Sequence, residues 1–465
     1  MKKTTGRIAA TLLVVAALQH QADAGDWLRF RGPNGIGISH DETPPPVEWS
    51  PTENVKWKVA LPGAGVSSPI VVGDRVFVTC FSGYGGDGDP GNMDDLVRHL
   101  VCVDRNTGDI AWQKAVPAVL PEDPWRQPGI PAHGYASHTP VSDGQHVYVF
   151  FGKTGVIAYD LEGNQLWQKS VGTGSDVQRW GSSSSPILMD DLVVVVAGPE
   201  SRTIYGLNAE TGEEVWSSEA EGFGNTWGTP AIADLDGDEK EIVIGTPYEI
   251  WGLNPANGKL RWYCEAGESE QFSSSVVTID GIVYSSEGRG GGMFALKAGG
   301  RGDVTEESVL WSGTSTGRFG SPVVYDGRMY VIGNNIANCF DASTGERIYQ
   351  GRLQASDSAA AANEERAQES DEQQRPGGGR TGGGRRGGRG RGGQDYSSPV
   401  SANGMIYYVA GNGVTYVIRA TDSFDQVAAN RVTDGSESFG ATPAISDGAI
   451  YLRSDKHLYC VAGSD

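Results

Sequence analysis

The residues with the clearest chemical potential form one acidic run, Asp234-Leu-Asp236-Gly-Asp238-Glu-Lys-Glu241. Carboxylates at alternate positions around a glycine turn can converge on one hard cation, and Ca²⁺ takes about 6–8 oxygen ligands. We therefore predict a calcium site with Asp234, Asp236, Asp238 and Glu241 as ligands. The alternative is an acidic, solvated hairpin turn, because the corresponding turns elsewhere in the chain contain only Asp-Gly.

Other reactive side chains form no comparable set. His133 and His138 lie five residues apart and could hold a metal between them, but loop histidines satisfied by hydrogen bonds are the favoured interpretation. The glycines of 288–292 are followed by neither a helix pattern nor Gly-Lys-Ser/Thr, so they do not form a phosphate loop. Serine recurs too regularly to nominate a nucleophile. The sequence therefore nominates no catalytic and no cofactor-binding residue.

The cysteines are few and far apart. Their odd number and wide spacing do not make a disulfide framework. Three of them occupy the same place in different repeats, which favours small buried apolar residues. Cys80 and Cys102 lie on neighbouring expected strands of one unit, so a bond between these two stays open. The five are Cys80, Cys102, Cys264, Cys339 and Cys460.

The elements that position these residues follow from an internal repeat. Each unit opens with small residues, usually ending in proline, and continues with β-rich runs separated by Asp-Gly, Asn-Gly or Thr-Gly turns. Four short strands in about 40–50 residues are typical of a propeller blade. The openings lie at Ser68, Thr139, Ser185, Thr229, Ser275, Ser321, Ser398 and Thr442. We therefore predict an all-β fold over residues 55–465, an eight-bladed β-propeller with four antiparallel strands per blade.

The first and last units complement each other. The last unit ends after its third strand, whereas residues 54–59 carry the tryptophan of a fourth strand with no strands before it. We expect this N-terminal strand to complete the C-terminal blade, because that pairing removes two open sheet edges.

A tryptophan ends most units. Trp112, Trp167, Trp216, Trp262 and Trp311 follow one another at spacings of 55, 49, 46 and 49 residues. A flat aromatic at this position can bury roughly 200 Å² against the neighbouring blade. Stacking on sugars is the alternative role, but the regular spacing favours a structural one.

The stretch Asp104-x-x-Thr-Gly-x-x-x-Trp112, repeated at Asn208 to Trp216 and closely at Asn254 to Trp262, resembles the tryptophan-docking repeat of PQQ-type propellers. That family includes quinoprotein dehydrogenases and BamB, the outer-membrane barrel assembly lipoprotein. The opening Trp27-x-x-Phe-Arg-Gly-Pro-Asn-Gly35 resembles the N-terminal segment of BamB-like secreted propellers. The acidic run is similar to the D-x-D-G-D calcium loops of integrin-type propellers, although Glu239 stands where those loops usually have a second glycine.

The dehydrogenases of this family carry a vicinal Cys-Cys disulfide beside the quinone, and some carry Cys-x-x-Cys-His for haem; this chain has neither. No Glu, Asn and Asp set matches the calcium that activates the quinone. The resemblance therefore implies the fold, while PQQ is not expected as a cofactor. BamB is lipid-anchored, and this chain lacks the anchoring cysteine.

Residues 1–24 combine a basic start, an apolar run from Ile8 to Leu18 and the cleavage pattern Ala22-Asp-Ala24. They predict a signal peptide, and hence a periplasmic or secreted protein without a lipid anchor. No later stretch is apolar for 18 residues, so no membrane span is expected. The formal net charge of −21 disfavours nucleic acid as a partner.

Three further segments lie outside the repeat. Residues 25–54 form an N-terminal extension that we expect to pack across one face of the propeller. Residues 354–395 are rich in Gly and Arg and should be a disordered insertion; an RGG-like nucleic-acid tract and a tether for acidic surfaces are the alternatives. Loops 82–98 and 117–136 are expected to build a binding face.

These observations predict a non-catalytic propeller that serves as a binding or scaffold module, similar to BamB-like propellers. The expected partner is a protein or a cell-envelope polymer, and the expected state is a monomer. A PQQ-dependent quinoprotein oxidoreductase with a divergent site is one alternative. A carbohydrate-binding propeller is another.

Overall fold

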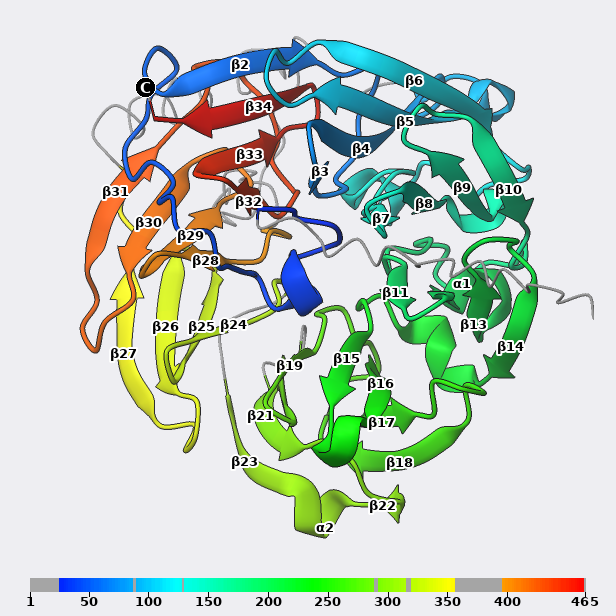
Figure 1. The fold of residues 1–465 in the computed structure, drawn as a ribbon, viewed down its shortest axis with the longest axis vertical. Coiled ribbons are helices and arrows are strands. Elements are labelled where there is room, and N and C mark those ends of the chain that lie inside the picture. The colour runs from blue at the N-terminus through cyan, green and yellow to red at the C-terminus, as the bar shows by residue number, and fades with distance from the viewer. Residues whose placement is uncertain are drawn as a thin grey trace, which may run out of the picture.

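The computed structural model describes residues 25–86, 89–127, 129–287, 292–314, 319–355 and 395–463. Eight antiparallel sheets stand around one central axis (Figure 1). The predicted all-β, eight-bladed propeller is thereby confirmed. The expected signal peptide 1–24 and residues 356–394 of the expected insertion lie outside the described residues.

In each blade the strands follow one another from the axis outward. Blade 1 contains β3 (Ile70–Val72), β4 (Arg75–Ser82), β5 (Val97–Asp104) and β6 (Ile110–Pro117). Blade 2 contains β7 (Val141–Ser142), β8 (His146–Phe150), β9 (Val156–Asp160) and β10 (Gln165–Lys169). Blade 3 contains β11 (Ile187–Met189), β12 (Leu192–Ala197), β13 (Thr203–Asn208) and β14 (Glu214–Glu219). Blade 4 contains β15 (Ala231–Asp234), β16 (Lys240–Thr246), β17 (Glu249–Leu253), β18 (Leu260–Glu265) and an added β22 (Gly302–Asp303).

The other four blades follow the same plan. Blade 5 contains β19 (Val277–Ile279), β20 (Ile282–Ser286), β21 (Gly292–Lys297) and β23 (Val309–Thr314). Blade 6 contains β24 (Val323–Tyr325), β25 (Arg328–Gly333), β26 (Ile336–Asp341) and β27 (Arg347–Arg352). Blade 7 contains β28 (Val400–Ala402), β29 (Met405–Val409), β30 (Thr415–Arg419), β31 (Gln426–Asn430) and an added β1 (Ile38–Ser39). Blade 8 contains β32 (Ala444–Ser446), β33 (Ala449–Arg453), β34 (His457–Ala462) and β2 (Val55–Ala60).

Short helices lie in the connections between these strands. They are η1 (Pro33–Gly35), η2 (Met93–Asp95), η3 (Ile130–Ala132), η4 (Gly152–Thr154), η5 (Glu221–Asn225), η6 (Asp236–Asp238), α1 (Gly198–Ser201) and α2 (Thr305–Ser308). Within the described ranges, none of the helices has the length and apolar character needed to cross a bilayer.

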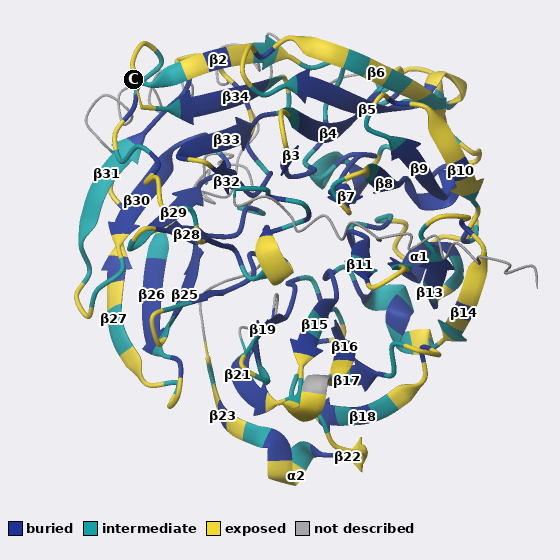
Figure 2. Ribbon diagram, in the orientation of Figure 1, coloured by how far each residue is buried: buried dark blue, intermediate teal, exposed yellow. Residues whose placement is uncertain are grey.

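Burial follows position in the blade (Figure 2). The second and third strands are apolar almost throughout, as in β12, because both faces of each sheet pack against neighbouring blades. The outermost strands alternate between more buried and exposed residues, as β2 does, because one face meets solvent. The core therefore consists of layers between blades.

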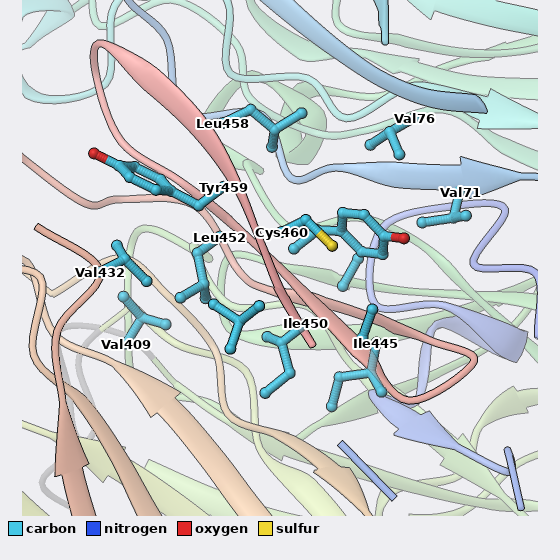
Figure 3. Close-up of a cluster of buried hydrophobic side chains, with 14 of the residues drawn as sticks. Val71, Val76, Val409, Val432, Ile445, Ile450, Leu452, Leu458, Tyr459 and Cys460 are labelled. Atoms are coloured by element: carbon cyan, nitrogen blue, oxygen red, sulfur yellow. The ribbon is translucent and has the colours of Figure 1, made fainter. Parts of the chain in front are cut away.

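The N-terminal strand β2 pairs antiparallel with β34, with Trp57 opposite Cys460. One hydrophobic cluster consequently joins blades 1, 7 and 8 across the point where the two ends of the chain meet. Figure 3 shows Val76 of β4, Val409 of β29 and Ile450 of β33 in this cluster.

The tryptophans dock on the next blade, as the repeat predicts. Trp167 Nε1 donates to the carbonyl oxygen of Ala209 in blade 3 at 2.9 Å, and its ring lies over Gly212. A Cβ at Gly212 would lie 2.6 Å from the ring, and φ of +72° there also favours glycine. The same Nε1 bond to the next blade is made by Trp57, Trp112 and Trp311.

Four blades depart from this pattern. Trp216 of blade 3 lies over Gly258, but its Nε1 has no hydrogen-bond partner among the described residues. Blade 6 has Tyr349 at the tryptophan position.

Trp262 turns its Nε1 to Glu241 of its own blade at 2.6 Å, because blade 5 lacks the Thr-Gly turn on which it would dock. Blade 7 has Ala428 at the tryptophan position, and its cluster is instead filled by Trp49 of the N-terminal extension. That extension therefore supplies an aromatic side chain that the repeat lacks.

All five cysteines are buried and free. In the β4–β5 ladder Cys80 is opposite His99, and Cys102 is opposite Phe77. The two cysteines are three residue pairs apart, or about 10 Å along the strands. That separation is too large for a disulfide without backbone movement. The register of the two strands therefore rules out a bond between Cys80 and Cys102 in this structure.

Candidate functional site: the central cavity and the polar cluster beside it

A cavity of about 270 Å³ lies on the propeller axis. Each blade contributes two residues to its wall, both from the segment that leads into the innermost strand. Since residues two apart on an extended chain face the same side, the two contributions form two tiers around the axis.

The lower tier is a ring of eight hydroxyl residues, which we call the hydroxyl ring. Each backbone N–H in the ring donates to the hydroxyl oxygen of the next blade, and the bond from Thr442 to Ser68 closes the circle. The donor–acceptor distances are 2.9–3.1 Å. The members are Ser68, Thr139, Ser185, Thr229, Ser275, Ser321, Ser398 and Thr442, all buried.

The hydroxyl ring explains why serine or threonine opens every unit. The chain runs inward at these positions without a sheet partner, so each N–H needs an acceptor that is not a ladder carbonyl. A hydroxyl from the neighbouring blade supplies it. Each hydroxyl accepts one N–H and still carries a proton, for which the described residues offer no acceptor.

The upper tier lies two residues before the hydroxyl ring and differs from blade to blade; we call it the variable tier. Blades 4, 6 and 7 contribute aromatic side chains, blades 2, 3 and 5 serines, and blades 1 and 8 a valine and a glycine. In blade order the members are Val66, Ser137, Ser183, Trp227, Ser273, Phe319, Tyr396 and Gly440.

Two aromatic pairs stand in the wall of the cavity. The rings of Phe319 and Tyr396 have centroids 4.9 Å apart. Trp227 pairs at 5.8 Å with Trp180, which comes from the loop between blades 2 and 3. The Asp176 carboxylate accepts the backbone N–H of Trp180 at 2.9 Å, so this bond fixes the backbone of the loop that carries the indole.

The N-terminal extension forms the floor. It crosses the axis near the far ends of the innermost strands (Figure 1), where Trp27 forms a β-bridge with Val71 and β1 pairs in parallel with β28. Phe30 reaches the cavity from this side. These contacts involve Trp27, Phe30 and β1 from residues 25–54; the bounds expected for the extension stay a prediction.

Two buried arginines fix the extension to blades 4 and 6 of the ring. Arg29 donates to the carbonyl oxygen of Pro230 at 3.2 Å, and Arg31 donates to that of Pro322 at 2.6 Å. Burial lowers the pKa of Arg29 to about 10 and that of Arg31 to about 9. Both remain cationic at neutral pH, so the carbonyls hold charged groups.

A cluster of buried charges lies beside the cavity, between blades 1, 2 and 3. Arg98 Nη2 lies 2.6 Å from Glu122 Oε1, and Lys153 Nζ lies 3.6 Å from Asp123 Oδ1. We call these four residues, with His138, Ser182 and Glu200, the polar cluster. They surround a cavity of about 20 Å³, which is room for about one water molecule.

Three members of the polar cluster form a chain of hydrogen bonds. Ser182 Oγ donates to Glu200 Oε1 at 2.5 Å and lies 3.0 Å from His138 Nε2. Burial raises the pKa of Glu200 to about 7. Burial, with smaller contributions from Arg98 and His133, lowers the pKa of His138 to about 3.

This arrangement does not activate a serine nucleophile. In such catalysis the histidine stands between the serine and the acid and takes the serine proton. Here Ser182 stands in the middle, and its hydroxyl donates a hydrogen bond to Glu200 rather than to His138. The imidazole of His138 also packs on Phe150 at 4.5 Å, which holds it in place as a neutral ring.

The predicted calcium ligands are only partly assembled. Asp234 ends β15 and Asp236 begins η6, both exposed, whereas Glu241 is fully buried and accepts from Trp262 and Arg261. The side chain of Asp238 lies outside the described residues. Among the side chains that are described, no group of three His, Cys, Asp or Glu residues is placed to hold a metal. The calcium site stays a prediction, and Glu241 is already engaged elsewhere.

His133 and His138 make their hydrogen bonds in different parts of the site. His133 Nε2 lies 2.7 Å from the carbonyl oxygen of Trp180, and its Nδ1 lies 2.6 Å from Ser137 Oγ. His138 belongs to the polar cluster. Both imidazoles are thus engaged by protein groups, as the favoured interpretation of the sequence holds.

The loop 117–136 was expected to bind, and it carries Glu122 and Asp123 of the polar cluster. Sequence reasoning missed Arg98, Lys153 and Glu200, because their segments share no motif. The ring hydroxyls were visible as a recurring residue type, but their mutual bonding was not predicted.

Comparisons with known proteins complete this description. A family model for the outer membrane protein assembly factor BamB matches residues 34–178 and 98–350. BamB of Salmonella typhimurium is 30% identical over 110 residues, which are 22% of this chain and 27% of that protein. The matched stretch therefore spans about a quarter of that relative's length.

Solved structures share the fold at low identity. BamB from Moraxella catarrhalis has a TM-score of 0.55 at 13% identity, covering 87% of this chain and 96% of that one. Quinohemoprotein alcohol dehydrogenase from Comamonas testosteroni has a TM-score of 0.60 at 11% identity, covering 96% and 82%. The computationally designed Ika8 protein reaches 0.51 at 12% identity, covering 87% and 98%. An assembly factor, an enzyme and a design share this architecture, so the fold alone does not decide function.

Proposed function

Because the chain belongs to the family of the outer membrane protein assembly factor BamB, we propose that it is a non-catalytic propeller that binds a protein partner in the cell envelope. The partner class follows from the family, since the name of that factor refers to the assembly of outer membrane proteins. The site on this chain follows from its own loops.

The main support for this proposal is a pair of loops that the polar cluster holds rigidly. Lys153 Nζ donates to the carbonyl oxygen of Pro121 at 3.0 Å and to Ser175 Oγ at 2.8 Å. Ser175 in turn donates to Asp123 at 2.6 Å. Loop 117–136 and the loop carrying Ser175 are thereby tied to each other and to blade 2. We call these two loops the loop platform.

The loop platform exposes apolar side chains. Val177 is 90% exposed, and Val119 and Leu120 are about 40% exposed on the neighbouring loop. Among the described residues, the other exposed aliphatic side chains lie singly near the tryptophans of blades 1–5, as Val215 does. Apolar groups gathered on ordered loops mark a protein-binding surface, whereas scattered ones do not.

Among the described residues, the quinoprotein alternative has no matching site. PQQ is a polycarboxylate, which calls for cationic partners. The described residues that line the central cavity include no Lys or Arg. The chain also has no vicinal Cys-Cys. The residues present therefore do not fit the quinone.

Site-specific photo-crosslinking tests the proposal. A benzophenone amino acid at Val177 should give an adduct with a protein of the outer membrane assembly machinery in cells of the source organism. The same group at Val215, which is 54% exposed on the rim, is the matched control and should not. Leu120→Asp should reduce the Val177 adduct severalfold. Equal adducts at both positions, or none at Val177, would contradict a partner on the loop platform.

A further inference from the structure

We propose that the central cavity is a binding site for an uncharged saccharide, independently of the partner on the loop platform. The first argument is charge. The chain carries a formal net charge of −21, yet the described residues that line the cavity include no Asp, Glu, Lys or Arg. His133 also lines it, and burial lowers the pKa of this imidazole. A charged ligand would lose its hydration here without gaining an ionic partner.

The second argument is the combination of surfaces. A sugar ring presents apolar C–H faces and hydroxyl groups that both donate and accept. The variable tier offers flat aromatic faces on blades 4, 6 and 7, while the hydroxyl ring below it offers eight O–H donors. A purely apolar ligand would leave those donors unpaired in a buried place, which is unfavourable. A sugar can satisfy both surfaces.

The third argument is that the wall is fixed before a ligand arrives. Trp227 Nε1 donates to the carbonyl oxygen of Gly181 at 2.7 Å, and Asp176 holds the backbone of Trp180. The hydroxyl oxygens are positioned by the N–H bonds of the ring. A prearranged site saves the entropy of ordering side chains on binding. By contrast, the carboxamide of Gln271 makes no hydrogen bond to a described residue and remains available to a ligand.

The geometry also defines the entrance. The N-terminal extension closes the axis at the level of Val71, beyond the hydroxyl ring, and Phe30 covers the floor. The variable tier and the loops of Trp180 and Gln271 lie on the other side of the ring, because they precede the innermost strands. A ligand therefore enters from the face opposite the extension. The volume of about 270 Å³ lies just below the range of about 300–1,000 Å³ that is typical of small-molecule sites, which suits a short saccharide.

Titration calorimetry and tryptophan fluorescence of the full chain provide the test, with glucose, maltose, cellobiose and diacetylchitobiose as probes. At least one probe should bind with a millimolar or lower Kd and change the emission of the Trp180–Trp227 pair. Gln271→Ala and Tyr396→Ala should each weaken that binding about tenfold. Tyr248→Ala is the matched control, because Tyr248 is 47% exposed outside the cavity, and it should bind as the parent does.

Several outcomes would overturn the assignment. Binding by none of the four probes would do so, as would binding that survives both Gln271→Ala and Tyr396→Ala. Indole binding without saccharide binding would make the cavity an apolar site. PQQ binding that is tighter than the binding of any sugar would show that the cavity accepts a charged cofactor instead. Gln271→Ala removes a carboxamide that makes no hydrogen bond to a described residue, so a loss of binding in that variant with an unchanged Tm is not a folding defect.

Discussion

The rim and the axis of this propeller are both circles of inter-blade contacts, but they are organised differently. At the rim, one contact recurs, a tryptophan over a glycine turn, as Trp167 lies over Gly212. At the axis, every blade contributes a serine or threonine to the hydroxyl ring. The residue that each blade contributes to the variable tier above it, by contrast, ranges from glycine to tryptophan. Repetition therefore marks the residues that hold the ring together, and departure from repetition marks the residues free to recognise a ligand.

The largest expected effect tests the rim. Trp167→Ala removes a side chain that is buried between blades 2 and 3 and its bond to Ala209, so it should lower the free energy of unfolding by about 3–5 kcal/mol. Denaturant titration measures this change. Leu166→Ala, at the exposed neighbouring position, is the control and should change stability by less than about 0.5 kcal/mol. Similar values for the two variants would mean that the docked tryptophans do not hold the rim.

A smaller, pH-dependent effect tests the polar cluster. The pKa of Glu200 is raised to about 7 in the folded chain, so the folded state binds the proton more tightly than the unfolded state does. The stabilisation that protonated Glu200 contributes is fully present below its unfolded pKa near 4.5. It is lost as the pH rises through the folded pKa of about 7. Between pH 5 and pH 8 the parent should lose up to about 3 kcal/mol that Glu200→Gln keeps. Parallel pH profiles of Tm for the two proteins would show that Glu200 titrates normally.

His138 determines how stability changes on the acidic side of the same pH profile. Its pKa is lowered to about 3, so the unfolded state takes up a proton first as pH falls below 6.5. Glu200 therefore lowers stability as the pH rises toward 7, and His138 lowers it as the pH falls below 6.5. The polar cluster stabilises the folded state most in mildly acidic solution.

The smallest effect tests the hydroxyl ring. Thr229→Ala leaves the N–H of Ser185 without an acceptor, which should cost about 1–3 kcal/mol. Thr229→Ser keeps the oxygen and should retain most of the stability. Denaturant titration and amide exchange at Ser185 read out the two variants. If serine destabilises as much as alanine, the methyl group rather than the bond matters at this position.

The difference between rim and axis also explains how much the sequence could predict. The fold followed from residues such as Trp112 and Gly108, because each unit must make the same contact and therefore keeps the same spacing. The polar cluster could not be predicted. Arg98, Lys153 and Glu200 come from three different blades, and only tertiary structure joins them.

The acidic run shows the opposite limit of sequence reasoning. Its alternating carboxylates suggest a single cation site, but Glu241 follows the strand period of β16 and turns into the core beside Trp262. The face on which a strand residue lies is set by pairing register, which the acidic pattern alone does not reveal.

The pairing of β2 with β34 has a consequence for the order in which the molecule is made. Strand β2, near the start of the chain, finds its partner only when the last strand, β34, exists, nearly the whole chain later. Loop-closure entropy makes such a contact slow to form. Until then the apolar cluster that joins blades 1 and 8 stays uncovered, and exposed apolar surface of this kind favours aggregation of a partly folded chain.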